Sequence, residues 1–384
     1  MVPTMMDVNK PSSGALNRDA ASKAKATGAT IEFQSVRKAY GSITALHDFS
    51  LTIHPGEFLT ILGSSGSGKT TALNALAGFS GADSGDILID GKSVIDEPPE
   101  RRNLGMVFQN YSLFPHMTVF DNIAFPLRMR RTPRREINER VERVLEIVRL
   151  GALAKRMPRD LSGGQQQRVA FARAIVFEPP VLLMDEPLGA LDLKLREALQ
   201  FEIKEIQHQL GCTVVYVTHD QREALAMSSR IVVLRDGRIE QVGTPSEMYD
   251  APRSRFVADF IGQTNLLAAD LSKAGSVSIP ELGAVYRDAE SQDRPGSWYA
   301  SVRPEKLQRR PVEESDIAVD VTVQEAVFLG DVIEYSARTP YGALIHFREQ
   351  RRDRDRVPER GETISLVLRP SDVVLVPDLT KTVR

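Results

Sequence analysis

The residues with the clearest chemical meaning lie between Gly63 and Thr71, where Gly63, Gly68, Lys69 and Thr70 fit the pattern G-x-x-x-x-G-K-[ST]. In such a loop, successive backbone N–H groups curl around an anion, the lysine ammonium reaches the β- and γ-phosphates, and the hydroxyl ligates Mg²⁺. The stretch therefore predicts a nucleotide phosphate site made of Gly63, Ser64, Ser65, Gly66, Ser67, Gly68, Lys69, Thr70 and Thr71.

The elements around this loop must place it at the end of a strand and the start of a helix. Phe58–Leu62 is an apolar run typical of a buried strand, and Thr71–Ala77 has the composition of a helix start. The positive end of that helix would point at the same anion. A Gly/Ser-rich turn closed by a surface lysine would not need this strand–loop–helix context.

A second apolar run, Pro180–Met184, delivers two carboxylates where it ends, at Asp185 and Glu186. Ligands bind at the carboxyl ends of strands in open α/β sheets, so Asp185 suits Mg²⁺ bound through water. Glu186 suits a general base that polarises the attacking water. The strand Thr213–Thr218 ends on His219, which is a candidate sensor of the γ-phosphate or simply a polar cap of the strand.

Three further features are weaker indications of a nucleotide site when each is taken alone. Ser162-Gly163-Gly164-Gln165 stands at a predicted helix start and offers free N–H groups to an anion, although Ser-Gly-Gly is also a common capping turn. Tyr40 could stack on an adenine ring or pack at a strand end. Gln109 closes the short apolar run Asn103–Phe108.

Taken together, these motifs resemble, in order and spacing, those of an ABC transporter ATPase over residues 31–261. The resemblance implies an α/β P-loop NTPase with a helical subdomain at about 110–178, using ATP and Mg²⁺. It also implies a homodimer in which each ATP lies between the Gly63–Thr71 loop of one copy and the Ser162 turn of the other. The implied residues are, for catalysis, Lys69, Gln109, Glu186 and His219; for Mg²⁺, Thr70, Gln109 and Asp185; and for nucleotide, beyond the loop, Tyr40, Ser162, Gly163, Gly164, Gln165 and the dimer-interface residue Asp192.

The composition changes after Gly243–Ser246. Glu247–Ile261 reads as one helix, and Phe260–Asn265 resembles the junction in importer ATPases that carry an additional C-terminal β-domain. Residues 262–384 are rich in strand and turn signals and contain a weak repeat, Ser301–Leu307 and Val367–Val373. The repeat suggests a barrel of the oligonucleotide/oligosaccharide-binding type, here with a regulatory role.

Length and composition limit the number of domains and the kinds of partner that the chain is expected to have. The 384 residues suggest two or three domains, and a net charge of −2 gives no general reason to expect a nucleic-acid partner. The one cysteine, Cys212, cannot form an intramolecular disulfide. No apolar run approaches the ~20 residues that span a bilayer, so a membrane role is expected to come through partners. Residues 1–30 have the composition of a disordered tail.

The sequence thus favours the ATPase subunit of an importer, at the cytoplasmic face of the inner membrane. Its expected partners are integral membrane permease subunits and, indirectly, a solute-binding protein. Within importers, the junction most resembles those for spermidine and putrescine, with ferric iron, sulfate, phosphonate or sugars as alternatives. An exporter ATPase and a soluble ABC protein of translation or DNA repair are the rival classes. Tyr111, Leu113, Phe114 and Pro115, after Gln109, would contact the permease or pack in the core.

Overall fold

The computed structural model describes residues 28–189, 191–272, 274–288, 296–313, 315–351 and 356–377. Residues 1–27 of the predicted tail lie outside this part. The end of that tail, however, belongs to the fold, since Ala29 is buried and its carbonyl accepts a hydrogen bond from Thr213 Oγ1 at 2.7 Å. The folded part therefore begins before Ile31, because Ala29 N also donates to the Pro180 carbonyl at 3.4 Å and the Thr30 carbonyl accepts from Asp90 N at 2.9 Å.

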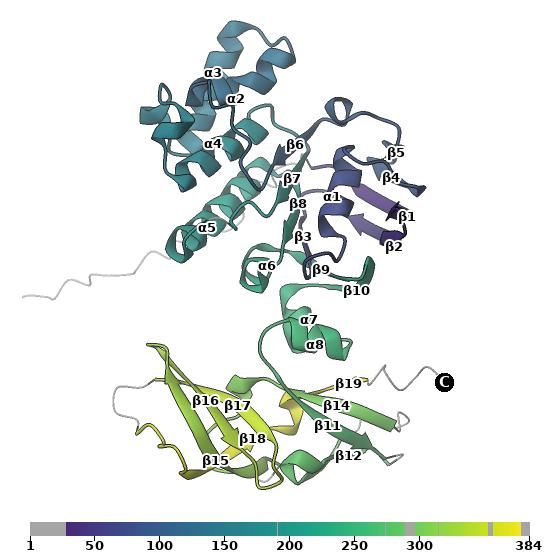
Figure 1. The fold of residues 1–384 in the computed structure, drawn as a ribbon, viewed down its shortest axis with the longest axis vertical. Helices are drawn as coiled ribbons and strands as arrows, with labels where there is room; N and C mark the ends of the chain where they lie inside the picture. Colours follow the sequence, from purple (N-terminus) through teal and green to yellow (C-terminus); the bar gives the residue numbers. More distant parts are fainter. Residues whose placement is uncertain are drawn as a thin grey trace, which may run out of the picture.

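A six-stranded sheet forms the centre of the first part (Figure 1). Its order is β10-β9-β3-β8-β7-β6, and all neighbours are parallel except the β9–β10 hairpin. The strands are β3 (Phe58–Leu62), β6 (Leu104–Val107), β7 (Val181–Asp185), β8 (Thr213–Thr218), β9 (Arg230–Arg235) and β10 (Arg238–Gly243). Because β3, β7 and β8 run in the same direction, the segments that follow them meet at one edge of the sheet.

A second, antiparallel sheet has the order β2-β1-β4-β5. It contains β1 (Ile31–Tyr40), β2 (Ile43–Ile53), β4 (Ser84–Ile89) and β5 (Lys92–Ser93). The helix α1 (Lys69–Ala77) packs between the two sheets, because its buried Leu73 and Leu76 share one core with Phe33 and Ile61.

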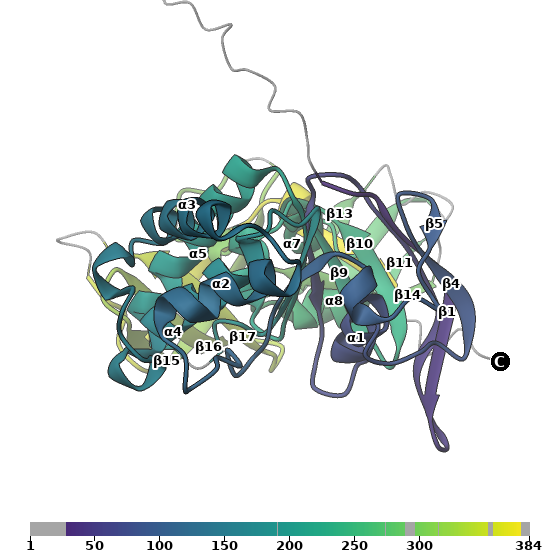
Figure 2. The same ribbon diagram turned by 90° about the horizontal axis from the view of Figure 1, so that it is seen from above.

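Helices make up the other side of this part. They are α2 (Val119–Met129), α3 (Arg134–Ile147), α4 (Gly163–Ile175), α5 (Leu193–Leu210) and α6 (Gln221–Met227). In both Figure 1 and Figure 2, α2, α3 and α4 lie on the side opposite β1 and β4. These three helices fall within the range predicted for the helical subdomain, and Ile123, Val141 and Phe171 pack with Tyr216 in a separate core.

The helix predicted for Glu247–Ile261 is wrong in one respect, because it is two helices. The structure has α7 (Pro245–Asp250) and α8 (Arg255–Phe260). Pro252 lacks a backbone N–H and disfavours helical geometry at the preceding residue, and Ala251 has φ −135° and ψ 55°. Ser254 then starts α8 by accepting a hydrogen bond from Val257 N at 3.3 Å. Both helices pack on the first part of the structure, because Met248 and Val257 share a core cluster with Leu62 of β3.

The second part is built from two antiparallel sheets around one core, in the orders β13-β12-β11-β14-β19 and β17-β16-β15-β18. The strands are β11 (Asn265–Leu271), β12 (Ser276–Ile279), β13 (Ala284–Arg287), β14 (Gly296–Val302), β15 (Ile317–Phe328), β16 (Val332–Arg338), β17 (Leu344–Gln350), β18 (Thr363–Leu368) and β19 (Val373–Pro377). The two repeats meet here: each ends in a 3₁₀ turn, and Lys306 Nζ of one donates to Asp372 Oδ1 of the other at 2.9 Å.

None of the helices in the described part of the chain has both the length and the hydrophobicity that crossing a bilayer requires.

Candidate active site

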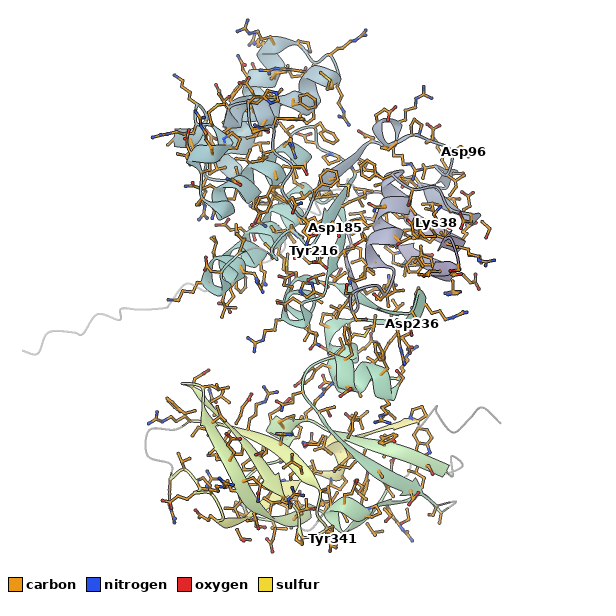
Figure 3. All side chains as sticks on the ribbon, in the orientation of Figure 1. Lys38, Asp96, Asp185, Tyr216, Asp236 and Tyr341 are labelled. Atoms are coloured by element: carbon orange, nitrogen blue, oxygen red, sulfur yellow. The ribbon has the colours of Figure 1, made fainter. Side chains whose placement is uncertain are left out.

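The ends of β3, β7 and β8 open onto one cleft of about 790 Å³. Figure 3 marks Asp185 and Tyr216 on the neighbouring strands β7 and β8 near this edge. The cleft brings together residues that are far apart in the sequence. It is lined by Ala45, Ser64, Ser65, Gly66, Gly68, Lys69, Thr70, Thr71, Gln109, Asp185, Glu186 and His219.

The Gly63–Thr71 loop has the conformation that its glycines make possible. Gly68 has φ 103°, which an L-residue rarely adopts, and a Cβ there would meet the carbonyl of Ala45. Lys69 is buried, and its Nζ donates to the carbonyl of Ser64 at 2.9 Å. Ser67 Oγ is buried without a hydrogen-bond partner in the described residues. Neither Ser67 nor Gly63 is among the residues that line the cleft, whereas the Lys69 ammonium is among them and fits a bound phosphate.

Burial lowers the pKa of Lys69, while the charges of Glu186 and Asp185 oppose that shift. Conversely, burial and then repulsion from Glu186 raise the pKa of Asp185, against the effects of Thr70 and Lys69. Thr70 Oγ1 donates to Asp185 Oδ1 at 3.4 Å. A hydroxyl and a carboxylate are hard oxygen ligands, and a cation here would relieve the repulsion between the two carboxylates, so the site fits Mg²⁺.

Glu186 lies between two polar side chains. His219 Nδ1 is 3.1 Å from Glu186 Oε1, and Gln109 Nε2 donates to Glu186 Oε2 at 3.5 Å. Glu186 has φ 43°, an unfavourable conformation for a residue with a Cβ, and its N–H is held by the Val217 carbonyl at 2.9 Å. The backbone of β8 thus fixes the carboxylate in the cleft despite the strain, as is common at functional sites.

The remaining predicted residues do not line this cleft. Ser162 begins α4 in a capping box, since its Oγ accepts from Gln165 N at 3.4 Å and its N–H donates to Gln165 Oε1 at 2.9 Å. Gly163 and Gly164 follow in the first turn of α4. Asp192 caps α5 by accepting from Leu195 N at 3.0 Å. These residues are on the same molecule but outside its own phosphate site, as expected for groups that would serve a second copy.

Two residues of the cleft and its surroundings carry no signal in the sequence. Ala45, on β2, lines the cleft, and an alanine carries no chemical signal in the sequence. Arg173, on α4, donates to the carbonyls of Tyr111 and Ser112 at 2.9 and 2.8 Å, which ties the segment after Gln109 to the helix that Ser162 begins. Both Tyr111 and Ser112 have positive φ, so this segment turns sharply at the contact.

Tyr40 is 51% exposed at the end of β1, which disagrees with a packed strand-end role. We therefore expect Tyr40→Ala to weaken ATP binding by about 1–3 kcal/mol, through loss of ring stacking, without lowering the melting temperature. Calorimetric titration and thermal unfolding of the same samples measure both. Ile43→Ala is the matched control, because Ile43 is 72% exposed on the adjoining strand and has no aromatic ring. Unchanged affinity in Tyr40→Ala would exclude Tyr40 from nucleotide binding.

Comparison with known proteins places this geometry in a family. The family model described as ABC transporter matches residues 46–189, and the one described as TOBE domain matches residues 300–376. The spermidine/putrescine import ATP-binding protein of Rubrobacter xylanophilus is 46% identical over 88% of this chain and 90% of its own length. This chain belongs to the ATP-binding subunits of ABC transporters.

The names of two other relatives state either the same cargo or a different one. The spermidine/putrescine import ATP-binding protein of Thermobifida fusca is 44% identical over 90% of this chain and 93% of its own length. The Fe(3+) ions import ATP-binding protein of Brucella abortus is 45% identical over 82% of this chain and 89% of its own length.

Among solved structures, a dimeric bacterial ABC transporter cassette matches with a TM-score of 0.51 and 36% identity, covering 56% of this chain and 98% of its own. The same cassette in a post-hydrolysis state bound to ADP and Pi matches with a TM-score of 0.51 and 35% identity. The predicted fold, an ABC ATPase followed by a β-rich domain, is thereby confirmed, and the subunit is an ATPase.

Proposed function

We propose that this subunit hydrolyses ATP to power import of a polyamine through a membrane permease. The observation that carries the proposal is the cleft that gathers Lys69, Asp185, Glu186 and His219, on a chain similar over most of its length to spermidine/putrescine import ATP-binding proteins. Ferric iron is the second candidate cargo, because the iron-import relative is nearly as similar but covers less of this chain.

The nucleotide would be held mainly by its phosphates. Backbone N–H groups of Ser64–Thr71 and the positive end of α1 would surround the β- and γ-phosphates, with Lys69 Nζ turning from the Ser64 carbonyl toward them. Tyr40 would cover the adenine. Thr70, Gln109 and Asp185 would hold Mg²⁺, which neutralises phosphate charge when bound.

Hydrolysis would depend on Glu186 as general base, since its carboxylate is fixed in the cleft and lies next to both His219 and Gln109. Glu186 would accept a proton from the attacking water, which Gln109 would help to orient. His219, whose side chain is 63% exposed, would donate to the γ-phosphate. Each of these groups is positioned by a strand end or by the segment that follows it.

The active form would be a homodimer. Ser162–Gln165 and Asp192 lie outside the cleft of their own chain, and the dimeric cassettes support pairing of two copies. Head-to-tail pairing would bring these residues to the site of a second copy. The first-turn N–H groups of α4 would then stabilise charge on the γ-phosphate from across the interface.

The permease would bind beside Gln109, with a solute-binding protein acting through the permease and the subunit at the cytoplasmic face of the membrane. Of the four candidate contacts, Tyr111 is buried in the helical core, so it packs rather than docks. Leu113, Phe114 and Pro115 are partly or fully exposed and are the proposed contact residues.

Uptake of labelled solutes by cells tests which solute the transporter imports. Deletion of the gene should abolish uptake of labelled spermidine or putrescine while leaving ferric iron uptake intact, and the parent gene should restore it. Glu186→Gln should not restore it, because transport requires hydrolysis. Loss of iron uptake with normal polyamine uptake would assign the second cargo instead.

The β-domain is proposed to regulate or stabilise the dimer. Arg303 joins the two parts, donating to the carbonyls of Tyr249 and Ala258 at 2.8 and 3.3 Å. A chain cut after Gln263 keeps every nucleotide motif and the α7–α8 core, so we expect ATP affinity close to that of the full chain. Hydrolysis should fall through weaker dimerisation and recover at higher protein concentration. A folded, truncated chain that fails to bind ATP would show that the nucleotide site needs the β-domain.

A further inference from the structure

One guanidinium joins the two loops that flank the proposed catalytic centre. Arg196, in the first turn of α5, donates from Nη1 to Asp220 Oδ2 at 3.0 Å and from Nη2 to the carbonyl of Leu191 at 3.1 Å. Leu191 directly precedes Asp192, and Asp220 directly follows His219. A single planar group therefore spans from the proposed dimer-interface loop to the loop of the proposed phosphate sensor.

The surroundings of Arg196 hold this bridge in place. Its side chain is 23% exposed and that of Asp220 is 27% exposed, so the pair is only partly screened by solvent. Its Nε is buried without a hydrogen-bond partner in the described residues and lies 3.8 Å from Glu223 Oε1. Glu223 is itself fixed, because Tyr216 Oη and Thr218 Oγ1 both donate to its Oε2 at 2.7 Å.

Asp220 uses its other oxygen to hold the His219 loop. Its Oδ1 accepts from the backbone N–H groups of Arg222 and Glu223 at 2.8 and 3.2 Å, which starts α6, and its own N–H donates to Thr218 Oγ1 at 3.0 Å. A displacement of the Asp220 carboxylate would therefore move the backbone next to His219. Arginine suits this position because its donors have fixed relative directions, which the single ammonium of lysine cannot reproduce.

We propose that Arg196 is a positioning residue that couples the placement of the Asp192 loop to the placement of His219. When a second copy fixes Asp192, the Leu191 carbonyl and the guanidinium move together, and the Asp220 carboxylate carries His219 toward the γ-phosphate. Hydrolysis is thereby linked to dimer closure within each chain. The inference rests on the proposed roles of Asp192 and His219.

Arg196→Lys tests the bridge while keeping the charge beside Glu223. We expect kcat to fall about tenfold or more, the rate equivalent of one charge-assisted hydrogen bond, with KM and ATP affinity unchanged. Asp220→Asn, which keeps an oxygen to cap α6, should give the same pattern. The matched control is Arg230→Lys, because Arg230 makes a similar contact to Glu57 at 2.9 Å and to the Thr52 carbonyl at 3.3 Å, away from both loops. Its kcat should stay within about twofold of the parent.

A double-mutant cycle separates coupling from general loosening. Asp192→Asn, which preserves the cap of α5, should lower kcat in the parent but add little in the Arg196→Lys background. Losses that multiply, or an Arg196→Lys kcat within about twofold of the parent, would overturn the inference. Glu186→Gln is measured in parallel. If Glu186→Gln is inactive and Arg196→Lys has the kcat of the parent, only the proposed role of Arg196 is refuted. If Glu186→Gln is active, the proposed catalytic role of Glu186 is refuted as well.

Discussion

We expect Glu186→Gln to bind ATP as tightly as the parent and to hydrolyse it about 10²–10⁴-fold more slowly, the usual contribution of a positioned base. The amide has the shape of the carboxylate but cannot accept the proton of the attacking water. Its neighbours His219 and Gln109 remain, and the backbone strain at this position is unchanged because both side chains carry a Cβ. With hydrolysis blocked, ATP should trap the closed dimer, which light scattering detects.

Glu178→Gln is the matched control for this substitution. Glu178 also has a left-handed backbone, with φ 54°, and its carboxylate makes an exposed contact to Arg143 at 3.8 Å. We expect hydrolysis at the parent rate from this variant. If Glu186→Gln also hydrolysed ATP near the parent rate, Glu186 would not be the general base.

We expect Ser162→Arg to abolish hydrolysis but to leave ATP binding by the monomer near normal. The new side chain stands at the start of α4, outside the cleft of its own chain, where the γ-phosphate held by a second copy would have to lie. Losing the serine cap costs about 1 kcal/mol of stability, so Ser162→Ala is measured alongside to account for that part.

Mixing two inactive variants tests whether each ATP site is built from two chains. In a heterodimer of Ser162→Arg and Lys69→Ala chains, one composite site has both Lys69 and Ser162 intact. With random pairing, half of the dimers are mixed and each has one good site, so about a quarter of the parent activity should return. Heterodimers confirmed by mass spectrometry that show no recovery would argue against sites built from two chains.

The sequence predicts the cleft well because its residues follow parallel strands. Apolar runs such as Phe58–Leu62 and Pro180–Met184 identify those strands, and the carboxyl ends of parallel strands meet at one edge. The geometry of Lys69, Asp185 and His219 follows almost directly from that rule.

What the sequence does not predict depends on contacts between distant residues. The arginines of helices are usually solvated, so neither Arg173 nor Arg196 can be distinguished from surface residues before their carbonyl partners are known. The φ of Glu186 and the burial of Tyr111 are likewise set by tertiary packing. The break between α7 and α8 is different, since Pro252 is visible in the sequence and proline disfavours helical geometry at the preceding residue.

The two hydrogen bonds from Arg173 have a thermodynamic consequence. They link the carbonyls of Tyr111 and Ser112 to α4. The surface proposed to bind the permease and the helix proposed to contact ATP would therefore move together. Linkage between two binding sites is reciprocal: if ATP changes the affinity for the permease by some factor, the permease must change the affinity for ATP by the same factor. In the proposed complex, the permease with its loaded cargo would act as an allosteric effector of nucleotide binding, and the direction of that effect would set how much ATP is consumed when there is nothing to import.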